Sequence, residues 1–206
     1  SKNYGYFFLD SIYESLRLPL FISNHTRKYD IKYYVNHIMK LLVYSRILNP
    51  ESKKATFEAK DRFFNMNFDF SLDDVYRSLT VMNNFKEDLE VWIHNQVKEL
   101  IGRDTTLVFY DVTNYYFEIE YDDEDEVDDN ENIMEQGLRK KGVSKEYRPE
   151  PIIQMGMFID RNGIPIAYKL FSGNTNDKIT LVPVLEEMKS KYNLGRIIVV
   201  ADKGLN

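Results

Sequence analysis

The stretch TTLVFYDVTNYYF, at residues 105–117, decides the fold. It is rich in β-branched and aromatic residues and follows Gly102, which predicts a long β-strand. Asp111 interrupts the apolar part of this strand. Because a carboxylate buried in such a strand is costly unless it is paired or holds a metal ion, Asp111 is a candidate functional residue.

Three further strands and a helix are predicted after this stretch. Residues 152–159 and 164–171 are strand-like, and the Asn-Gly step between them is typical of a hairpin, so we expect them to pair antiparallel. A helix is predicted over residues 178–192, and the apolar run at 196–202 is typical of a buried parallel strand. The order is β-β-β-α-β, and a right-handed crossover through the helix would place the last strand beside the first.

A second acidic residue, Asp202, ends the last of these predicted strands. Taken alone, either Asp111 or Asp202 is also compatible with a hydrogen-bonded aspartate in a strand or at its end. On two adjacent strands, however, the pair favours a shared divalent cation. Oxygen ligands without histidine or cysteine suit Mg²⁺ or Mn²⁺.

The first hundred residues have the pattern of helices. Apolar residues recur at helical spacing over residues 31–42, and Asn49-Pro50 ends that segment. A second helix is predicted to start at Ser71, and a third covers about residues 84–100. We therefore predict an α+β or α/β chain, with a helical region at 1–103, a sheet-bearing region at 104–206 and a charged loop at 118–150.

Charge and composition narrow the class of protein. The net charge is -6, but ten acidic residues and no basic one fall within residues 118–131, the acidic arm, which leaves a net charge of +4 elsewhere. A solvated loop is the default interpretation of the acidic arm, with a calcium site or a DNA mimic as alternatives. Without cysteine there is no disulfide or thiolate site, and without an apolar run of about 18 residues we expect a soluble, cytoplasmic protein with no membrane partner.

A basic segment follows the acidic arm directly. Residues 139–148 contain five cations, and these are Arg139, Lys140, Lys141, Lys145 and Arg148. A flexible, solvated loop is one interpretation. Because the segment leads into a predicted strand near the candidate carboxylates, we favour a loop that contacts DNA phosphates through charge.

Several pieces of the sequence, in order, carry a family resemblance. They include FYDVTNYYFE at 109–118, FSGNTND at 171–177 and VADKGL at 200–205. Over residues 105–206 the chain resembles the DDE transposases of bacterial insertion sequences, in the insertion-sequence-four-like group. Residues 46–53 and 72–79 are similar, less specifically, to the helical amino-terminal region of that family.

The resemblance implies an RNase H-like core, with Asp111 as the first catalytic and metal-binding aspartate and Asp202 as the second. The third acid of the family, a glutamate on a later helix, is expected beyond Asn206, so the core here is incomplete and this piece is expected to be inactive alone. In the basic segment, Val143, Glu146 and Tyr147 depart from the family pattern.

The implied activity is phosphoryl transfer with two Mg²⁺ or Mn²⁺ ions, which cleaves transposon ends and joins a 3′-hydroxyl to target DNA. DNA is the expected partner, the expected assembly is a homodimer on DNA, and the expected location is the bacterial nucleoid. Asn174 and Lys203 are further candidate DNA contacts. In the helical region the candidates for end recognition are Arg27, Lys28, Lys32, Lys53, Lys54, Lys60 and Arg62.

Two alternatives remain open from the sequence. The chain is also compatible with a transposase remnant that binds DNA without chemistry, or with an RNase H-like nuclease that cuts without joining strands.

Overall fold

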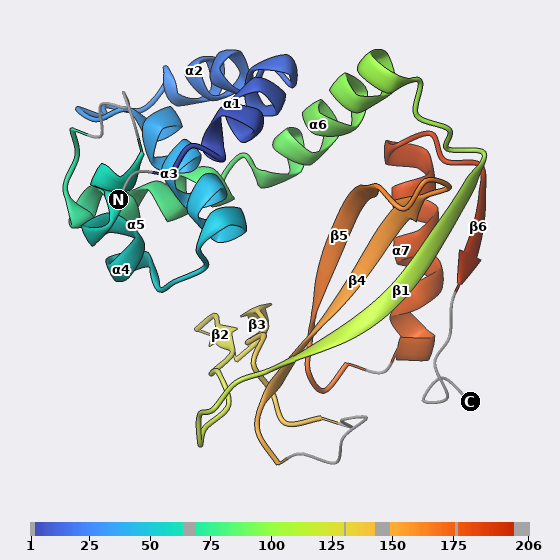
Figure 1. Ribbon diagram of the computed structural model, residues 1–206. Coiled ribbons are helices and arrows are strands. Elements are labelled where there is room, and N and C mark those ends of the chain that lie inside the picture. Colours follow the sequence, from blue (N-terminus) through green and yellow to red (C-terminus); the bar gives the residue numbers. More distant parts are fainter. Residues whose placement is uncertain (1–2, 64–68, 130, 143–148, 176, 200–206) are drawn as a thin grey trace. The chain divides into compact units, whose positions relative to one another are not determined.

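A computed structural model of the chain describes residues 3–63, 69–129, 131–142, 149–175 and 177–199 (Figure 1). The chain divides into two compact units, Ser1–Val97 and Lys98–Asn206. None of the helices in the described ranges combines the length and apolar character that crossing a lipid bilayer requires.

The first unit is helical, as predicted. Its elements are α1 (Tyr6–Ser15), α2 (Leu18–Thr26), α3 (Val35–Leu48), α4 (Lys53–Glu58), the short 3-10 helix η1 (Lys60–Arg62), α5 (Leu72–Asn83) and α6 (Lys86–Ile101), which continues into the second unit. The predicted start at Ser71 is confirmed, because the Ser71 hydroxyl accepts a hydrogen bond from Asp74 N while the Asp74 carboxylate accepts one from Ser71 N.

Aromatic and aliphatic side chains from these helices form one core. Phe21, Ile38, Leu41, Tyr44 and Val75 are almost completely buried in it. The ring of Trp92, the one tryptophan, packs against this core at 5.5 Å from the Phe21 ring, and its Nε1 donates to the Leu16 carbonyl oxygen at 2.9 Å. Of the stripe predicted over residues 31–42, Val35, Ile38 and Leu41 face the interior of the unit, whereas Tyr34 precedes α3 and is 72% exposed.

A polar cluster lies beside that core. Lys40 is nearly buried and donates to Asp10 Oδ1 at 2.8 Å and to Glu14 Oε1 at 2.6 Å, while Tyr44 OH donates to Asp10 Oδ1 at 2.7 Å. Burial opposes ionisation of Asp10, but these hydrogen bonds and the Lys40 charge outweigh it and lower the pKa of Asp10. The cluster ties α1 to α3.

The second unit is built on a four-stranded sheet. Its strands are β1 (Leu107–Tyr116), β4 (Ile152–Asp160), β5 (Pro165–Ser172) and β6 (Arg196–Val199), in the order β5-β4-β1-β6. The pairs β1·β4 and β4·β5 are antiparallel, and β6 is parallel to β1 after a crossover through α7 (Asp177–Lys191). The predicted fold class is confirmed: a helical N-terminal region precedes a β-β-β-α-β unit, compatible with an incomplete RNase H-like core.

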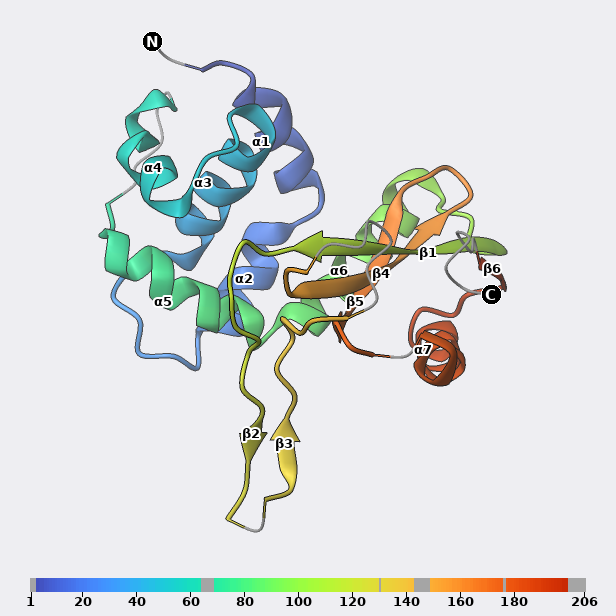
Figure 2. The same ribbon diagram turned by 90° about the horizontal axis from the view of Figure 1, so that it is seen from below.

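One face of the sheet is covered by α7 (Figures 1 and 2). Val112, Gly156 and Lys169 are register partners and share this face, and the Lys169 ammonium lies 3.2 Å from Glu187 of α7. Tyr110 packs on the same face against Phe158, with ring centroids 4.7 Å apart. A Cβ at Gly156 would lie 2.2 Å from the Tyr110 hydroxyl, so this packing requires glycine.

A buried ion pair closes the end of the sheet. Arg103 Nε lies 3.1 Å from Asp160 Oδ2, and both side chains have no exposed surface. Arg103 also donates to the Pro165 carbonyl oxygen, and Asp160 accepts from the backbone N–H groups of Asn162 and Ile164. The pair therefore fixes the β4–β5 turn to the segment that leads into β1.

A two-stranded ribbon, which the sequence did not predict, lies in and beside the acidic arm. It consists of β2 (Glu126–Val127) and β3 (Ile133–Glu135), and Figure 2 shows it extending away from the sheet.

Candidate functional site

Asp111 lies at the fifth position of β1, on the face of the sheet opposite α7. Side chains alternate along a strand, so Val108 and Tyr110 point to the covered face and are buried, whereas Asp111 and Thr113 point to the other and are exposed. The expectation of a buried carboxylate was therefore wrong. Within the sheet-bearing unit, the described helix α7 covers the opposite face of this strand.

The neighbouring strand leads toward the second predicted aspartate. The last described pair of β1 and β6 is Tyr110 with Val199, one residue before Asp111. Asp202 and Lys203 come three and four residues after Val199 in the sequence, and both lie outside the described residues. On its other side, Asp111 is the register partner of Met157.

The donor chemistry at Asp111 suits a hard cation, because an exposed carboxylate offers oxygen ligands without displacing a partner. Among the described residues, no hydrogen bond or ion pair to the Asp111 side chain is found, and no group of three or more His, Asp or Glu side chains is placed to hold a metal ion. Asp111 would therefore need Asp202 or another acid outside the described ranges to hold such an ion.

The basic segment is attached to the start of β4. Lys140 and Ile152 exchange two backbone hydrogen bonds, at 2.9 and 3.2 Å, and Gly173 N donates to the Leu138 carbonyl oxygen. Arg139, Lys140 and Lys141 are thus held at the end of the sheet, whereas Lys145 and Arg148 lie outside the described residues.

The first two cations of the basic segment are paired with the acidic arm. Arg139 donates from Nε to Asp123 Oδ1 at 2.7 Å, its NH2 lies 2.5 Å from the same oxygen, and Lys140 Nζ lies 2.9 Å from Asp125 Oδ1. The hydrogen bond from Arg139 lowers the pKa of Asp123, and the one from Lys140 lowers the pKa of Asp125. The sequence predicted both charged runs but not their pairing.

Asn174 belongs to the same end of the sheet. Its Oδ1 accepts from the Ser172 hydroxyl at 2.9 Å and from Gln136 Nε2 at 3.3 Å, and the described residues leave the amide N–H groups of Asn174 available to a ligand. Ser172 is the register partner of Ile153, four residues along β4 from Met157, the partner of Asp111. Asn174 and the basic segment therefore lie about 13 Å or more along the sheet from Asp111.

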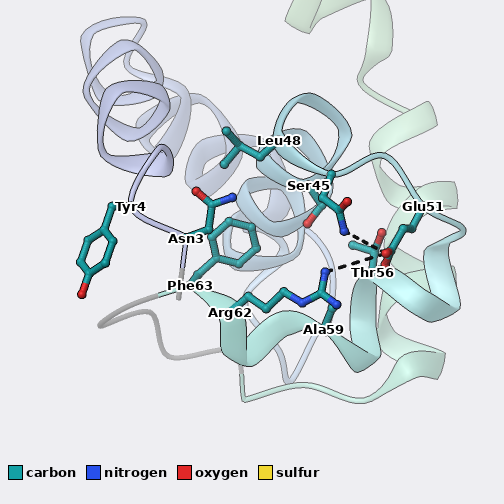
Figure 3. Close-up of a pocket in the computed structure, with 10 residues that line it drawn as sticks. Asn3, Tyr4, Ser45, Leu48, Glu51, Thr56, Ala59, Arg62 and Phe63 are labelled. Atoms are coloured by element: carbon teal, nitrogen blue, oxygen red, sulfur yellow. Dashed lines mark hydrogen bonds and ion pairs between the residues drawn. The ribbon is translucent and has the colours of Figure 1, made fainter. Parts of the chain in front are cut away.

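The helical unit has its own cavity, of about 500 Å³, between the start of the chain and the loop after α3 (Figure 3). Glu51 lies in its wall, accepts a hydrogen bond from Asn49 Nδ2 at 2.8 Å and lies 3.8 Å from Arg62 NH1. Of the candidate end-recognition residues, Arg27, Lys28, Lys32, Lys53, Lys54 and Arg62 are exposed. Lys60 instead packs over the rings of Phe57 and Phe70.

Comparison with known proteins found no matching family model and no matching curated protein. Among solved structures, the chain is 12% identical to the Mos1 transposase paired-end complex with left transposon end, with a TM-score of 0.26, over 86% of this chain and 55% of that chain. A pre-cleavage Mos1 transpososome gives 12% identity and a TM-score of 0.24, over 86% and 56%. This chain thus spans about half the length of these proteins, and such scores carry no argument about its function.

Proposed function

We propose that this chain carries part of the catalytic core of a DNA transposase that cleaves transposon ends and joins them to target DNA. The proposal rests on the topology of the sheet and on the position of Asp111 within it. It follows the resemblance to the insertion-sequence-four-like group that the sequence carries.

The main supporting observation is the exposed Asp111 on β1, next to the parallel strand β6. The parallel register runs up to the pair Tyr110 with Val199, and the sequence continues from Val199 toward Asp202. We infer that Asp111 and Asp202 act together. A Mg²⁺ or Mn²⁺ ion held by these two carboxylates would supply Lewis-acid stabilisation of charge in phosphoryl transfer.

The remaining candidate residues would bind and orient the DNA. Arg139 and Lys140 would contact phosphates through charge, and the free amide N–H groups of Asn174 would donate to a phosphate oxygen. Lys141, Lys145, Arg148 and Lys203 are proposed as further contacts of the same kind. In the helical unit, the exposed cations would bind the transposon end, and the protein would act as a homodimer on DNA. These cations are Arg27, Lys28, Lys32, Lys53, Lys54 and Arg62.

The first test is metal binding, which does not depend on activity. Calorimetric titration of the protein with Mn²⁺ should detect binding of the ion. This binding should be lost in Asp111→Asn and kept in Asp104→Asn. Asp104 is the matched control because it lies before β1 and its carboxylate accepts from Thr106. Equal Mn²⁺ binding by the Asp111→Asn variant would remove Asp111 from the metal site.

The second test is cleavage of DNA that carries the flanking terminal repeats, by the protein as its gene encodes it. We expect nicking that requires Mg²⁺ or Mn²⁺ and falls by a factor of about 10³ or more in Asp111→Ala. Strand-transfer products would distinguish a transposase from a nuclease. DNA binding without any cleavage in the wild type would favour the non-catalytic remnant instead.

A further inference from the structure

The acidic arm presents two kinds of carboxylate. Asp123 and Asp125 are partly buried and contact the basic segment, whereas Glu120 and Glu124 are exposed. In the part of the chain that the structure describes, no ion pair to Glu120 or Glu124 is found. Asp123 and Asp125 therefore face the cations, Asp122 accepts from the backbone N–H of Lys141 at 3.0 Å, and Glu120 and Glu124 face the solvent.

The close approach of the two segments is built into the backbone. Asp123 N donates to the Arg139 carbonyl oxygen at 2.8 Å, Arg139 N donates to Asp123 Oδ2 at 2.9 Å, and Gly137 N donates to Asp125 Oδ1 at 2.8 Å. A Cβ at Gly137 would lie 2.6 Å from the Asp123 carbonyl oxygen, so a larger residue there would push the segments apart. The arm is thus a specific partner of the basic segment rather than a freely solvated loop.

Each cation meets a carboxylate in the way that it would meet a phosphate. The Arg139 guanidinium uses two nitrogens against Asp123, and the Lys140 ammonium, whose side chain is only 13% exposed, is directed at Asp125. A DNA phosphate cannot pair with Arg139 or Lys140 while each of these cations is paired with its carboxylate. The side chains of Asp123 and Arg139 keep 25% and 42% exposure, so this pair is accessible to exchange, and Asp125 keeps 28% exposure on the acidic side of the second pair.

We propose that the acidic arm is an autoinhibitory competitor for DNA, in which Asp123 and Asp125 occupy the phosphate-binding groups of Arg139 and Lys140 until a phosphate backbone displaces them. This inference rests on the proposed function in one respect, namely that DNA is the ligand. When DNA binds, Arg139 and Lys140 exchange their carboxylate partners for phosphates. The net release of counterions at these two contacts is therefore smaller than it would be if both cations were unpaired before binding.

The test compares two double variants with the same change in net charge. Asp123→Asn with Asp125→Asn removes the competing charges but keeps side-chain acceptors for the backbone N–H groups. Glu120→Gln with Glu124→Gln is the matched control on the solvent side of the same arm. Affinity for duplex DNA is measured over a range of salt concentrations, and retention on heparin serves as a second, generic polyanion probe.

We expect the Asp123 and Asp125 variant to bind DNA about five- to tenfold more tightly than the wild type, well beyond the control. Its plot of log K against log salt should also be steeper, by up to about 1.8 for two recovered phosphate contacts. Equal tightening in both variants would reduce the effect to general charge and overturn the proposal. Weaker binding would overturn it too, because the acids would then order the basic segment for DNA.

The two proposals fail in different ways. Suppose that no variant binds DNA but that the Asp123 and Asp125 variant alone is retained more strongly on heparin. The acidic arm then competes with polyanions as proposed, and the proposed action on DNA is wrong. If heparin does not distinguish the variants either, the competitor itself is wrong.

Discussion

Two arginine–aspartate pairs in the sheet-bearing unit have the same chemistry and opposite surroundings. Arg103 and Asp160 have no exposed side-chain surface, whereas Arg139 and Asp123 keep 42% and 25% of theirs. A buried pair must stay together, because separation leaves a charge without water or a partner. An exposed pair is solvated when it opens, so its members can change partners. The buried Arg103–Asp160 pair is therefore a fixed part of the fold, whereas the Arg139–Asp123 pair is a contact that can be exchanged for another.

The largest expected effect comes from breaking the buried pair. Asp160→Asn keeps the shape of the side chain but leaves the Arg103 charge buried without a counter-charge, which should lower the free energy of unfolding by about 3–5 kcal/mol. Urea unfolding followed by circular dichroism measures this. Glu58→Gln, which breaks an exposed pair with Lys54, is the control and should leave the midpoint unchanged. Equal midpoints for the two variants would contradict the comparison.

An intermediate loss of stability is expected from breaking the polar cluster around Lys40, which is less buried than the Arg103–Asp160 pair. Lys40 is 11% exposed and serves Asp10 and Glu14, so Lys40→Met should destabilise the helical unit by about 1–3 kcal/mol. Fluorescence of Trp92, which lies in this unit alone, reports its unfolding separately from that of the sheet. Lys53→Met, at an exposed position, should have no such effect.

The same cluster predicts how stability depends on pH. The pKa of Asp10 is lowered from 3.8, so its contribution is complete above that value and is lost as the pH falls through the lower pKa of the folded state. The pKa of Lys40 is raised from 10.5, so its contribution is complete below 10.5 and is lost as the pH rises through the higher pKa of the folded state. Thermal unfolding followed by Trp92 fluorescence should lose the alkaline dependence in Lys40→Met and show a weaker acidic one, because Tyr44 still donates to Asp10. Two unchanged dependences would assign them to other groups.

The smallest effect on stability is expected at the Arg139–Asp123 pair, whose arginine keeps 42% of its side-chain exposure. Asp123→Asn should leave the urea midpoint of the sheet-bearing unit unchanged within error, because Arg139 stays solvated when its partner charge is lost. A clear fall in the midpoint would show that Asp123 is part of the fold, as Asp160 is, and would remove the difference between the two regions.

Much of the fold could be predicted because local signals agreed with the tertiary structure. The β-branched run around Val108, the hairpin before Ile164 and the cap at Ser71 each specify an element within a few residues. The exposure of Asp111 was also in the sequence, since apolar and polar residues alternate from Tyr110 to Thr113. That alternation is typical of a strand covered on one face only.

The pairing of the acidic arm with the basic segment could not be predicted in the same way. Asp123 and Arg139 are 16 residues apart, and the ribbon that brings them together has no alternation of apolar and polar residues. Its geometry depends on backbone contacts such as the one at Gly137. The acidic arm is followed in the sequence by the basic segment, which indicates that the two attract each other. The sequence does not indicate which acidic residue pairs with which basic one.

The position of β1 between β4 and β6 also sets the order in which the surroundings of Asp111 can form during synthesis. The β1·β4 pairing includes residues as close in the sequence as Tyr116 and Ile152, whereas the β1·β6 pairing joins Leu107 to the much more distant Arg196. The ribosome must therefore release α7 and β6 before the second side of β1 can be paired. Contacts of such long sequence separation form slowly. The nascent chain thus holds Asp111 beside an open strand edge until β6 has been synthesised, and such an unpaired edge is exposed to pairing with other chains.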